Sequence, residues 1–195
     1  DDLIYAHGHI SKLMPLVHLP VQSGSDKILK SMNRKHSIKD YLRIIERLKK
    51  INSKIKFSSD FIIGYPGETD KDFEETINLL NEVQYINTFS FIFSPRPGTP
   101  AAKMSETDTN IAKKRLIIFQ KKAEQIKLKY RNSLFKSNAL VLFENFTKDK
   151  QKLFGRDEFS NSVFVKAKDN LKGLLKSVKI VGGNQNTLFG DIEEK

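Results

Sequence analysis

The sequence predicts an α/β domain followed by a small antiparallel β-barrel. The first hundred or so residues alternate between strand-like and helix-like segments, which is typical of a sheet with helical crossovers. A long helical pattern follows over residues 108–134. The remaining residues form short apolar runs separated by polar turns, as in a small barrel of the OB type. We therefore expect one domain over residues 1–134 and a second over residues 135–195. The strands expected in the second domain are 139–144, 162–165, 177–181 and 186–190.

Continuous apolar strands joined by helices favour a parallel sheet in the first domain. Ser25 is placed to cap a short helix, and Ser37 with Asp40 resembles a capping box at the start of a longer one. Three strand–helix units fit half of an eight-stranded barrel or part of an open sheet, and periodicity alone does not choose between them. The expected strands are 16–21, 56–63 and 88–93, and the expected helices are 26–32, 37–51 and 69–83.

The helix expected over residues 108–134 is strongly basic. Its positive side chains allow two interpretations, an ordinary solvated helix face or a stripe that follows the phosphates of a nucleic acid. The apolar positions expected to face the barrel are Ile111, Leu116, Phe119, Ile126 and Tyr130. The basic positions are Lys113, Lys114, Arg115, Lys121, Lys122, Lys127, Lys129 and Arg131.

Charge is distributed unevenly along the chain, whose formal net charge is +11. Residues 1–102 hold 14 Lys and Arg against 12 Asp and Glu, whereas residues 103–195 hold 20 against 11. A genome that favours Lys codons would spread the excess evenly. The bias therefore indicates a polyanionic partner such as a nucleic acid.

Composition limits the kinds of site that the chain can build. It contains no cysteine, which excludes disulfides and thiolate-bound clusters within it. His7, His9, His18 and His36 lack metal-site spacing and are expected to be structural or surface residues. No apolar run is long enough to span a bilayer and the first residues do not resemble a signal peptide, so we expect a cytoplasmic protein that does not contact membranes.

Polar clusters follow each of the three expected strands of the first domain, where parallel α/β folds gather their ligands. Gln22 and Ser23 offer donors and acceptors for ribose hydroxyls or an amino-acid carboxylate. Gly64 allows a flat ring to approach the backbone, and Arg96 can pair with a carboxylate or a phosphate. Each cluster alone also fits a tight turn, but their shared edge favours a ligand site.

The acidic residues near these clusters leave alternatives open. Asp60 stands just inside the second strand, where it either orients a ligand or is a buried structural acid. Glu68 stands where a helix dipole favours an acid, and Glu74 with Glu75 is expected on a solvated helix face. The sequence has no Walker loop, dinucleotide-binding glycine motif, cysteine nucleophile or zinc-protease motif, so no catalytic residue is assigned.

Four segments of the chain closely resemble the radical-SAM methylthiotransferases in sequence, order and spacing. They are His18–Ser25, Met32–Arg34, Ser59–Thr69 and Ser94–Ala102. The tail, which includes Gly155–Arg156, Ser162–Val165 and Asn186–Gly190, is similar to the TRAM domain that ends those enzymes. The resemblance covers essentially the whole chain. It implies the C-terminal half of a TIM-like radical-SAM barrel followed by an OB-like TRAM domain.

The resemblance is closest to members that add a methylthio group to carbon 2 of N6-isopentenyladenosine at position 37 of tRNA. Such enzymes use S-adenosylmethionine (SAM) and two 4Fe-4S clusters, and a TRAM domain holds tRNA mainly by phosphate contacts and shape. The candidate cofactor-binding residues that it implies are Gln22, Ser23, Asp60, Ile62 and Gly64. The candidate substrate-binding or RNA-binding residues are Arg96, Lys113, Lys114, Arg115 and Arg156.

The chain departs from this family because the cysteine-bearing N-terminal cluster domain, the barrel's cysteine segment and the early strands are absent. Without thiolates this chain cannot ligate a cluster. We expect a C-terminal fragment that works only with the missing N-terminal half, which joins tRNA as an expected partner. Two alternatives stay open: a stand-alone RNA-binding module or inactive relic without catalysis, and a family member that acts on threonylcarbamoyl-adenosine in tRNA or on a ribosomal protein.

Overall fold

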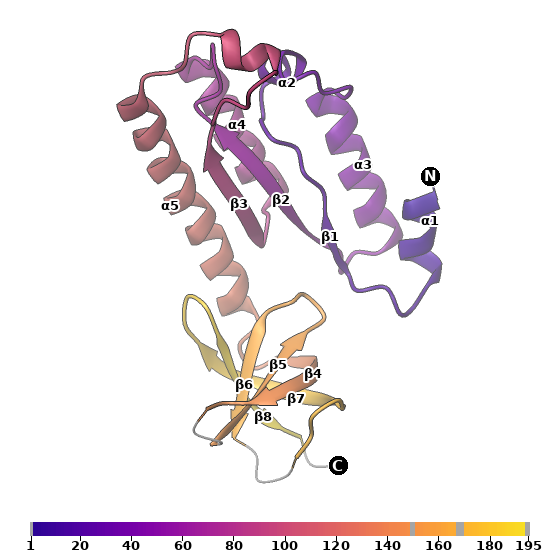
Figure 1. Cartoon of the computed structure of the whole chain (residues 1–195). Coiled ribbons are helices and arrows are strands. Elements are labelled where there is room, and N and C mark those ends of the chain that lie inside the picture. Colours follow the sequence, from indigo (N-terminus) through magenta and orange to yellow (C-terminus); the bar gives the residue numbers. More distant parts are fainter. Residues whose placement is uncertain (1, 149–150, 167–169, 194–195) are drawn as a thin grey trace. The chain divides into compact units, whose positions relative to one another are not determined.

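The chain forms a three-stranded parallel sheet with helices and, after it, a five-stranded closed barrel (Figure 1). The computed structural model describes residues 2–148, 151–166 and 170–193. Contacts between residues divide the chain into unit 1, residues 1–13 and 17–126, and unit 2, residues 14–16 and 127–195. Each unit has its own hydrophobic core. The predicted α/β part followed by a small barrel is therefore confirmed.

In unit 1 the strands lie in the order β1-β2-β3, and β2 pairs with β3 in parallel. β1 is shorter than the predicted strand 16–21 and ends two residues before Pro20. A parallel bridge from Gln22 to Phe61 resumes the pairing beyond it. The elements are α1 (Asp2–His9), β1 (Leu16–His18), α2 (Asp26–Ser31), α3 (Ile38–Ile51), β2 (Lys56–Ile63), α4 (Asp70–Val83), β3 (Asn87–Ile92), the 3-10 helix η1 (Pro100–Lys103) and α5 (Thr109–Ser133).

The starts of three helices test the capping predictions. Ser37 and Asp40 form the predicted capping box at α3, and Thr69 forms a second one with Asp72 at α4. Ser25 stands at the N-cap of α2, but its hydroxyl makes no capping bond there. It donates instead to Oδ1 of Asp72 at 2.7 Å, so the side chain ties the start of α2 to α4.

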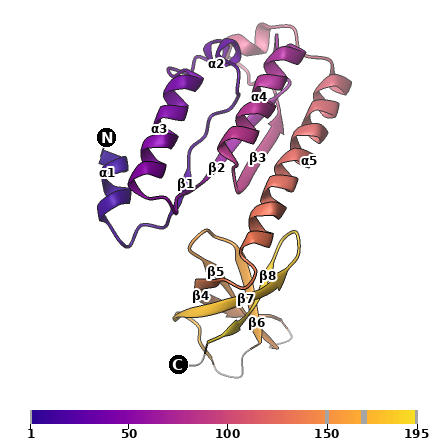
Figure 2. The same ribbon diagram turned by 180° about the vertical axis from the view of Figure 1, so that it is seen from behind.

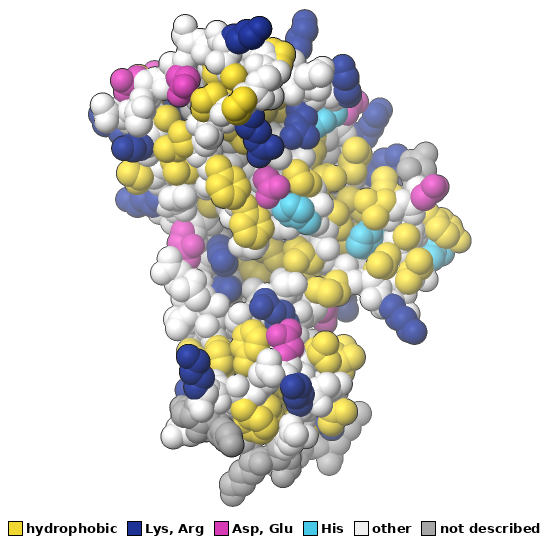
Figure 3. Space-filling view, in the orientation of Figure 1, with side chains coloured by type: hydrophobic (Ala, Val, Ile, Leu, Met, Phe, Trp, Pro, Cys, Tyr) yellow, Lys and Arg dark blue, Asp and Glu magenta, His cyan; other side chains and the backbone are white. Residues whose placement is uncertain are grey.

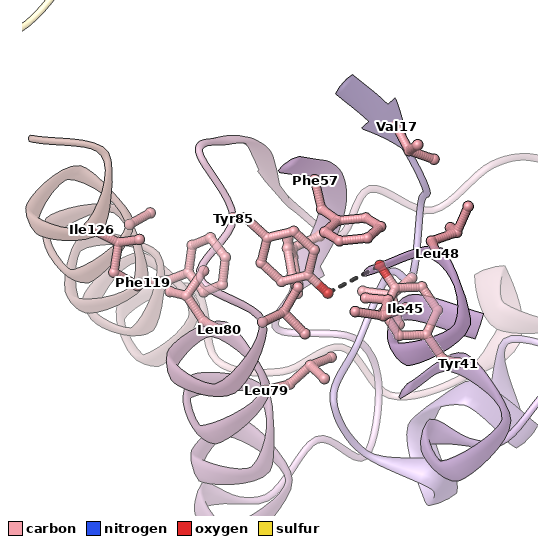
Figure 4. Packing of buried hydrophobic residues seen from close by; sticks show 14 of the residues in the cluster. Val17, Tyr41, Ile45, Leu48, Phe57, Leu79, Leu80, Tyr85, Phe119 and Ile126 are labelled. Atoms are coloured by element: carbon pink, nitrogen blue, oxygen red, sulfur yellow. Dashed lines mark hydrogen bonds between the residues drawn. The ribbon is translucent and has the colours of Figure 1, made fainter. Parts of the chain in front are cut away.

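The core of unit 1 lies between the sheet and the helices α3, α4 and α5, which cover one of its faces (Figures 1 and 2). Phe57, Phe61 and Phe119 are almost completely buried there. The Tyr85 hydroxyl donates to the Tyr41 hydroxyl at 3.0 Å inside this core (Figure 4). Since burial leaves a phenolate without solvent, it raises the pKa of Tyr85 far above its usual value, and the pair stays neutral.

The other face of the sheet is partly open. Along β2, Phe61 and Ile63 are buried against the helices, whereas Asp60 and Ile62 point the other way and keep some exposure. Their partners on β3, Phe89 and Phe91, are 48% and 60% exposed. Hydrophobic side chains accordingly gather over the sheet on this side (Figure 3).

The long basic helix begins and ends within a residue of the predicted bounds, but part of its predicted apolar face is wrong. Ile111, expected to face the barrel, is 44% exposed. The buried stripe in unit 1 runs instead through Ala112, Phe119, Ala123 and Ile126. Small alanines bring the helix close to the sheet, and Ile111 stands one position, or about 100°, off that stripe.

Unit 2 is a closed barrel with the strand order β4-β5-β6-β8-β7. Four of its neighbouring pairs are antiparallel, as predicted, but β6 and β8 are parallel. A ring of five strands cannot alternate direction all the way round, so at least one parallel pair is unavoidable. The strands are β4 (Asn138–Phe146), β5 (Lys152–Asp157), β6 (Ser162–Lys166), β7 (Leu175–Gly183) and β8 (Leu188–Ile192).

One strand of the barrel, β5, was not predicted from the sequence. Gly155 interrupts its apolar pattern, which weakens the strand signal. The structure shows why glycine stands there: a Cβ at this position would lie 2.4 Å from the carbonyl oxygen of Leu142 on β4. The barrel is consistent with a TRAM domain. Among the described residues, no helix has both the length and the apolar character that crossing a membrane requires.

Candidate functional site

A pocket of about 710 Å³ lies at the C-terminal ends of β1, β2 and β3 in unit 1. β2 and β3 contribute to its wall directly and the segment after β1 contributes Gln22, as parallel α/β folds lead one to expect. Its lining combines aromatic, aliphatic and polar side chains. The lining residues are Gln22, Ser31, Met32, Asn33, Arg34, Asp60, Ile62, Tyr65, Phe91, Ile92, Phe93, Ser94, Arg96, Thr99, Pro100 and Ala101.

Gln22 reaches the pocket from a strained backbone conformation, with φ of 78°. Two backbone hydrogen bonds to β2 hold it: its N–H donates to the Asp60 carbonyl at 3.0 Å, and its carbonyl accepts from Ile62 at 2.9 Å. Left-handed conformations of residues other than glycine are uncommon and gather at functional sites. Asn33, with φ of 58°, is a second such residue in the pocket wall.

Asp60 stands in the pocket wall at the centre of the open sheet face. Its side chain is 31% exposed, so it is not a fully buried structural acid. One carboxylate oxygen lies 3.4 Å from Nε2 of His18 on β1. The other ring nitrogen of His18 is 2.9 Å from the hydroxyl of Ser58. Asp60 is thus oriented by its neighbours and still open to a bound molecule.

Two of the predicted cofactor-binding residues do not line the pocket. Ser23 is 1% exposed; its Oγ accepts from the Ser25 N–H at 3.2 Å and lies 3.4 Å from Oγ1 of Thr76. Gly64 has φ of +72°, and a Cβ there would lie 2.7 Å from the Cβ of Ala112. Both residues shape the loops that follow β1 and β2, whereas Gln22, Asp60 and Ile62 form the wall.

Arg96 and the loop after α2 also line the pocket. Arg96 is exposed and lies in the loop after β3. Among the residues that the structure describes, none bonds the Gln22 side-chain amide or the Arg96 guanidinium, and both residues line the pocket. Sequence reasoning assigned no ligand role to Met32, Asn33 and Arg34, although they fall within a family-like segment. The left-handed conformation of Asn33, which helps to place this loop, is visible only in the structure.

The loop after β2 is held by a buried ion pair. Nη1 of Arg115 on α5 lies 2.9 Å from Oε2 of Glu68, and Nη2 lies 2.7 Å from Oδ1 of Asp70. Burial raises the pKa of Glu68, and the hydrogen bond from the Gly64 N–H and the charge of Arg115 oppose that rise. Arg115 is only 7% exposed. Arg115 therefore differs from the exposed Lys113 and Lys114, and we exclude it from the candidate RNA-binding residues.

Asp72 is the centre of a second polar network in unit 1. Its carboxylate accepts from Lys27 at 2.7 Å, from the Ser25 hydroxyl at 2.7 Å and from the Thr69 hydroxyl at 2.6 Å. Burial alone would raise the pKa of Asp72, but these hydrogen bonds hold it well below its usual value. The network joins the starts of α2 and α4, and it is structural because all its bonds run within the protein.

Three other predicted residues lie on the surface. Lys113 and Lys114 are exposed on α5, and Arg156 is exposed on β5. Nε of Arg156 lies 3.2 Å from Oε1 of Glu144. Of the predicted acids on α4, Glu74 is exposed and Glu75 partly so, as expected for a solvated helix face. Among the described residues, no group of three or more His, Asp or Glu side chains has metal-site geometry.

The comparisons with known proteins agree with the α/β fold of the first part of the chain. Residues 8–80 match the family model of the radical SAM superfamily. The chain is homologous to the C-terminal part of tRNA-2-methylthio-N(6)-dimethylallyladenosine synthases. The protein of that name from Pelagibacter ubique (strain HTCC1062) is 53% identical over 194 residues, which cover 100% of this chain and 44% of the relative.

Two further relatives carry the same name. The protein from Rickettsia typhi (strain ATCC VR-144 / Wilmington) is 45% identical over 98% of this chain and 44% of its own length. The protein from Wolbachia pipientis subsp. Culex pipiens (strain wPip) is 43% identical over 97% of this chain and 44% of its own length. The chain thus spans less than half of the length of the curated relatives that it matches.

Proposed function

We propose that the chain is the C-terminal part of a tRNA methylthiotransferase that adds a methylthio group to carbon 2 of N6-isopentenyladenosine at position 37 of tRNA. The observation that carries the proposal is the single pocket to which the loops after β1, β2 and β3 all contribute. Those loops lie in segments that resemble the methylthiotransferases. The 53% identity to a synthase of this specificity over the whole chain supports the same assignment.

In this proposal SAM occupies the pocket. The amide of Gln22 and the carboxylate of Asp60 suit its hydroxyl and amino-acid groups, and the aliphatic side chain of Ile62 suits the flat adenine. Ser23 and Gly64 support these side chains from behind, while Arg96 faces the substrate. When it is bound beside a cluster, SAM supplies the methyl group and the 5′-deoxyadenosyl radical.

The iron–sulfur clusters do not fit the residues of this chain. The sequence contains no cysteine, so every thiolate ligand has to come from residues outside it. We therefore assign no radical step to this chain. Its role is to complete the SAM pocket and to hold tRNA, and its expected partner is the N-terminal half of the enzyme. A tRNA substrate places the protein in the cytoplasm.

We propose a division of labour at the residues already expected, 1–134 and 135–195. α5 continues unbroken to Ser133, and the first barrel strand begins at Asn138. In this proposal the first domain binds SAM, and the second is the TRAM domain that binds tRNA. The exposed Lys113, Lys114 and Arg156 are the proposed phosphate contacts.

Nucleoside analysis of tRNA from a strain that lacks the gene tests the proposal. We expect 2-methylthio-N6-isopentenyladenosine to disappear and N6-isopentenyladenosine to accumulate. Unchanged levels of the methylthiolated nucleoside would contradict the proposed substrate. Loss of methylthiolated threonylcarbamoyl-adenosine would instead identify the related tRNA specificity.

A second candidate is an RNA-binding protein without catalysis, and the absence of cysteine favours it. Sequencing the reading frame upstream of this chain separates the two candidates. The methylthiotransferase proposal requires six cluster-binding cysteines in the segment that precedes this one or in a partner chain. If neither source supplies them, the RNA-binding candidate replaces it.

A further inference from the structure

Three phenylalanines form a continuous row across the outer surface of the barrel of unit 2. Phe154 on β5 pairs with Phe164 on β6, and Phe164 pairs with Phe189 on β8. The ring centroids of Phe154 and Phe164 lie 5.3 Å apart at an interplanar angle of 52°. Phe189 is 36% exposed, and the other two are partly exposed. We call Phe154, Phe164 and Phe189 the phenylalanine row.

The row is not part of the barrel core. Side chains alternate between the inside and the outside of a strand, and the neighbours of each row residue fill the interior. Leu153, Val163, Val165 and Leu188 are almost completely buried there. Three adjacent aromatic rings are therefore presented outward, where small barrels usually carry polar residues. An exposed apolar patch of this kind marks an interaction surface.

Basic side chains flank the phenylalanine row. Nζ of Lys152 lies 5.8 Å from the centroid of the Phe189 ring, and Cζ of Arg156 lies 5.5 Å from that of the Phe154 ring. Lys166 is exposed and pairs with Lys152 across β5 and β6. Among the residues that the structure describes, Glu144 contacts this cluster through its ion pair with Arg156. The rings are thus bordered by three cations.

We propose that the phenylalanine row is a stacking surface for unpaired RNA bases. Aromatic rings stack on the face of any base, and neighbouring cations bind the phosphates between successive nucleotides. The cations favour a single RNA strand as the occupant, because its bases suit the rings and its phosphates suit the positive charges, whereas an apolar protein surface offers no anions. Identifying that RNA as the unpaired loop of tRNA rests on the proposed function. Binding of this kind adds base stacking to the phosphate and shape contacts expected from the sequence.

Binding of a fluorescently labelled eight-nucleotide oligoadenylate to the full chain tests the inference. The variants Phe164→Leu and Phe189→Leu keep an apolar side chain of similar size but lose the ring. We expect each to weaken binding roughly tenfold. The matched control is Phe135→Leu, because Phe135 is 37% exposed in the same unit but lies outside the row. The control variant should bind like the unchanged protein.

Two further measurements keep the inference falsifiable. Phe189→Trp retains a stacking ring and should preserve or tighten binding, while quenching of 2-aminopurine placed in the strand should report stacking directly. Thermal unfolding of each variant shows whether the barrel is intact, and only variants with an unchanged midpoint are compared. If intact Phe→Leu variants bind as tightly as the unchanged protein, the row is an apolar docking surface for protein and the inference is wrong.

The outcome can be separated from that of the proposed function. Oligoadenylate binding uses the chain alone and requires neither SAM nor clusters. If the variants show that the rings stack on bases but the tRNA nucleosides of the deletion strain are unchanged, the inference holds and the proposed function is wrong. If the methylthiolated nucleoside is lost but RNA binding does not depend on the rings, the proposed function holds and the inference is wrong.

Discussion

Arg115 on α5 and Glu68 in the loop after β2 form an ion pair at 2.9 Å, in which both side chains are almost inaccessible to solvent. The same guanidinium donates to the Glu68 carbonyl at 3.0 Å. Glu68 in turn accepts from the backbone N–H of Gly64 at 3.0 Å, and so sets the loop that ends β2. The pair therefore ties α5 to the strand end that carries the candidate cofactor pocket.

Removing Arg115 should destabilise unit 1 strongly. In Arg115→Met the carboxylate of Glu68 stays buried without its partner, which costs about 3–5 kcal/mol of unfolding free energy. Urea unfolding followed by circular dichroism measures the change. Lys114→Met alters the neighbouring exposed residue and should change stability by less than about 0.5 kcal/mol. Equal effects of the two substitutions would show that the ion pair has no special role.

Acid should weaken unit 1 through Asp72. The pKa of Asp72 is held below the ordinary value of 3.8, so the folded state favours the ionised form. Its contribution is complete above the unfolded pKa and is lost as pH falls from about 4 toward the folded pKa. Urea unfolding between pH 6 and pH 2 should therefore show a steeper loss of stability in the unchanged protein than in Asp72→Asn. Parallel pH profiles would contradict this assignment.

The barrel should not tolerate a side chain at Gly155. The added methyl of Gly155→Ala would meet the Leu142 carbonyl oxygen at 2.4 Å, which we expect to cost about 1–3 kcal/mol because backbone has to move. Gly182→Ala in β7 is the control, since no atom lies within 4 Å of its added Cβ. Thermal unfolding of both variants checks the difference. A Gly155→Ala variant as stable as Gly182→Ala would show that the two strands separate without cost.

Shortening Gln22 should weaken SAM binding. Gln22→Asn keeps the amide and suits the left-handed backbone, but it withdraws the amide from the pocket by one methylene. The loss of one hydrogen bond predicts roughly three- to tenfold weaker binding by calorimetry. The control is Gln84→Asn, because Gln84 has φ of 59° and caps α4 outside the pocket wall. If both variants keep the original affinity, Gln22 does not contact SAM.

Binding of tRNA should depend steeply on salt. Phosphate contacts release counterions, so the logarithm of the affinity falls linearly with the logarithm of salt concentration. Lys113→Gln with Lys114→Gln should lower the slope by about 1 for each contact removed. Binding assays from low to moderate salt give the slope. An affinity that does not change with salt would contradict the proposed phosphate surface.

Local sequence predicted most of the elements of unit 1. The capping boxes at Ser37 and Thr69 place the starts of α3 and α4, because a cap depends on residues only three positions apart. α1 was not predicted, since it buries no residue and has no apolar stripe to detect. β5 was missed because Gly155, which the barrel requires, breaks its strand pattern.

The candidate site was predicted in outline. Gln22, Asp60, Ile62 and Arg96 meet in one pocket because the ends of parallel strands share an edge. The order of strands and helices, which can be predicted from the sequence, implies that these strand ends lie at one edge of the sheet. The loop Met32–Arg34 was not assigned to the pocket, since its position depends on how α2 packs and no local pattern reports that.

The sequence by itself determined the order of the elements, most of the helix starts, the family resemblance and the basic second half, because each depends on residue type and near neighbours. Only the tertiary structure decided which polar side chains are free to bind. Ser23 and Arg115 are residue types that often bind ligands, but both are bonded inside the protein. Ser23 contacts Thr76, which is 53 positions away, and Arg115 bonds Glu68, which is 47 positions away. The phenylalanine row likewise exists only because strand pairing aligns three distant residues on one outer surface. These contacts depend on how distant segments pack together, and a local sequence pattern does not predict that packing.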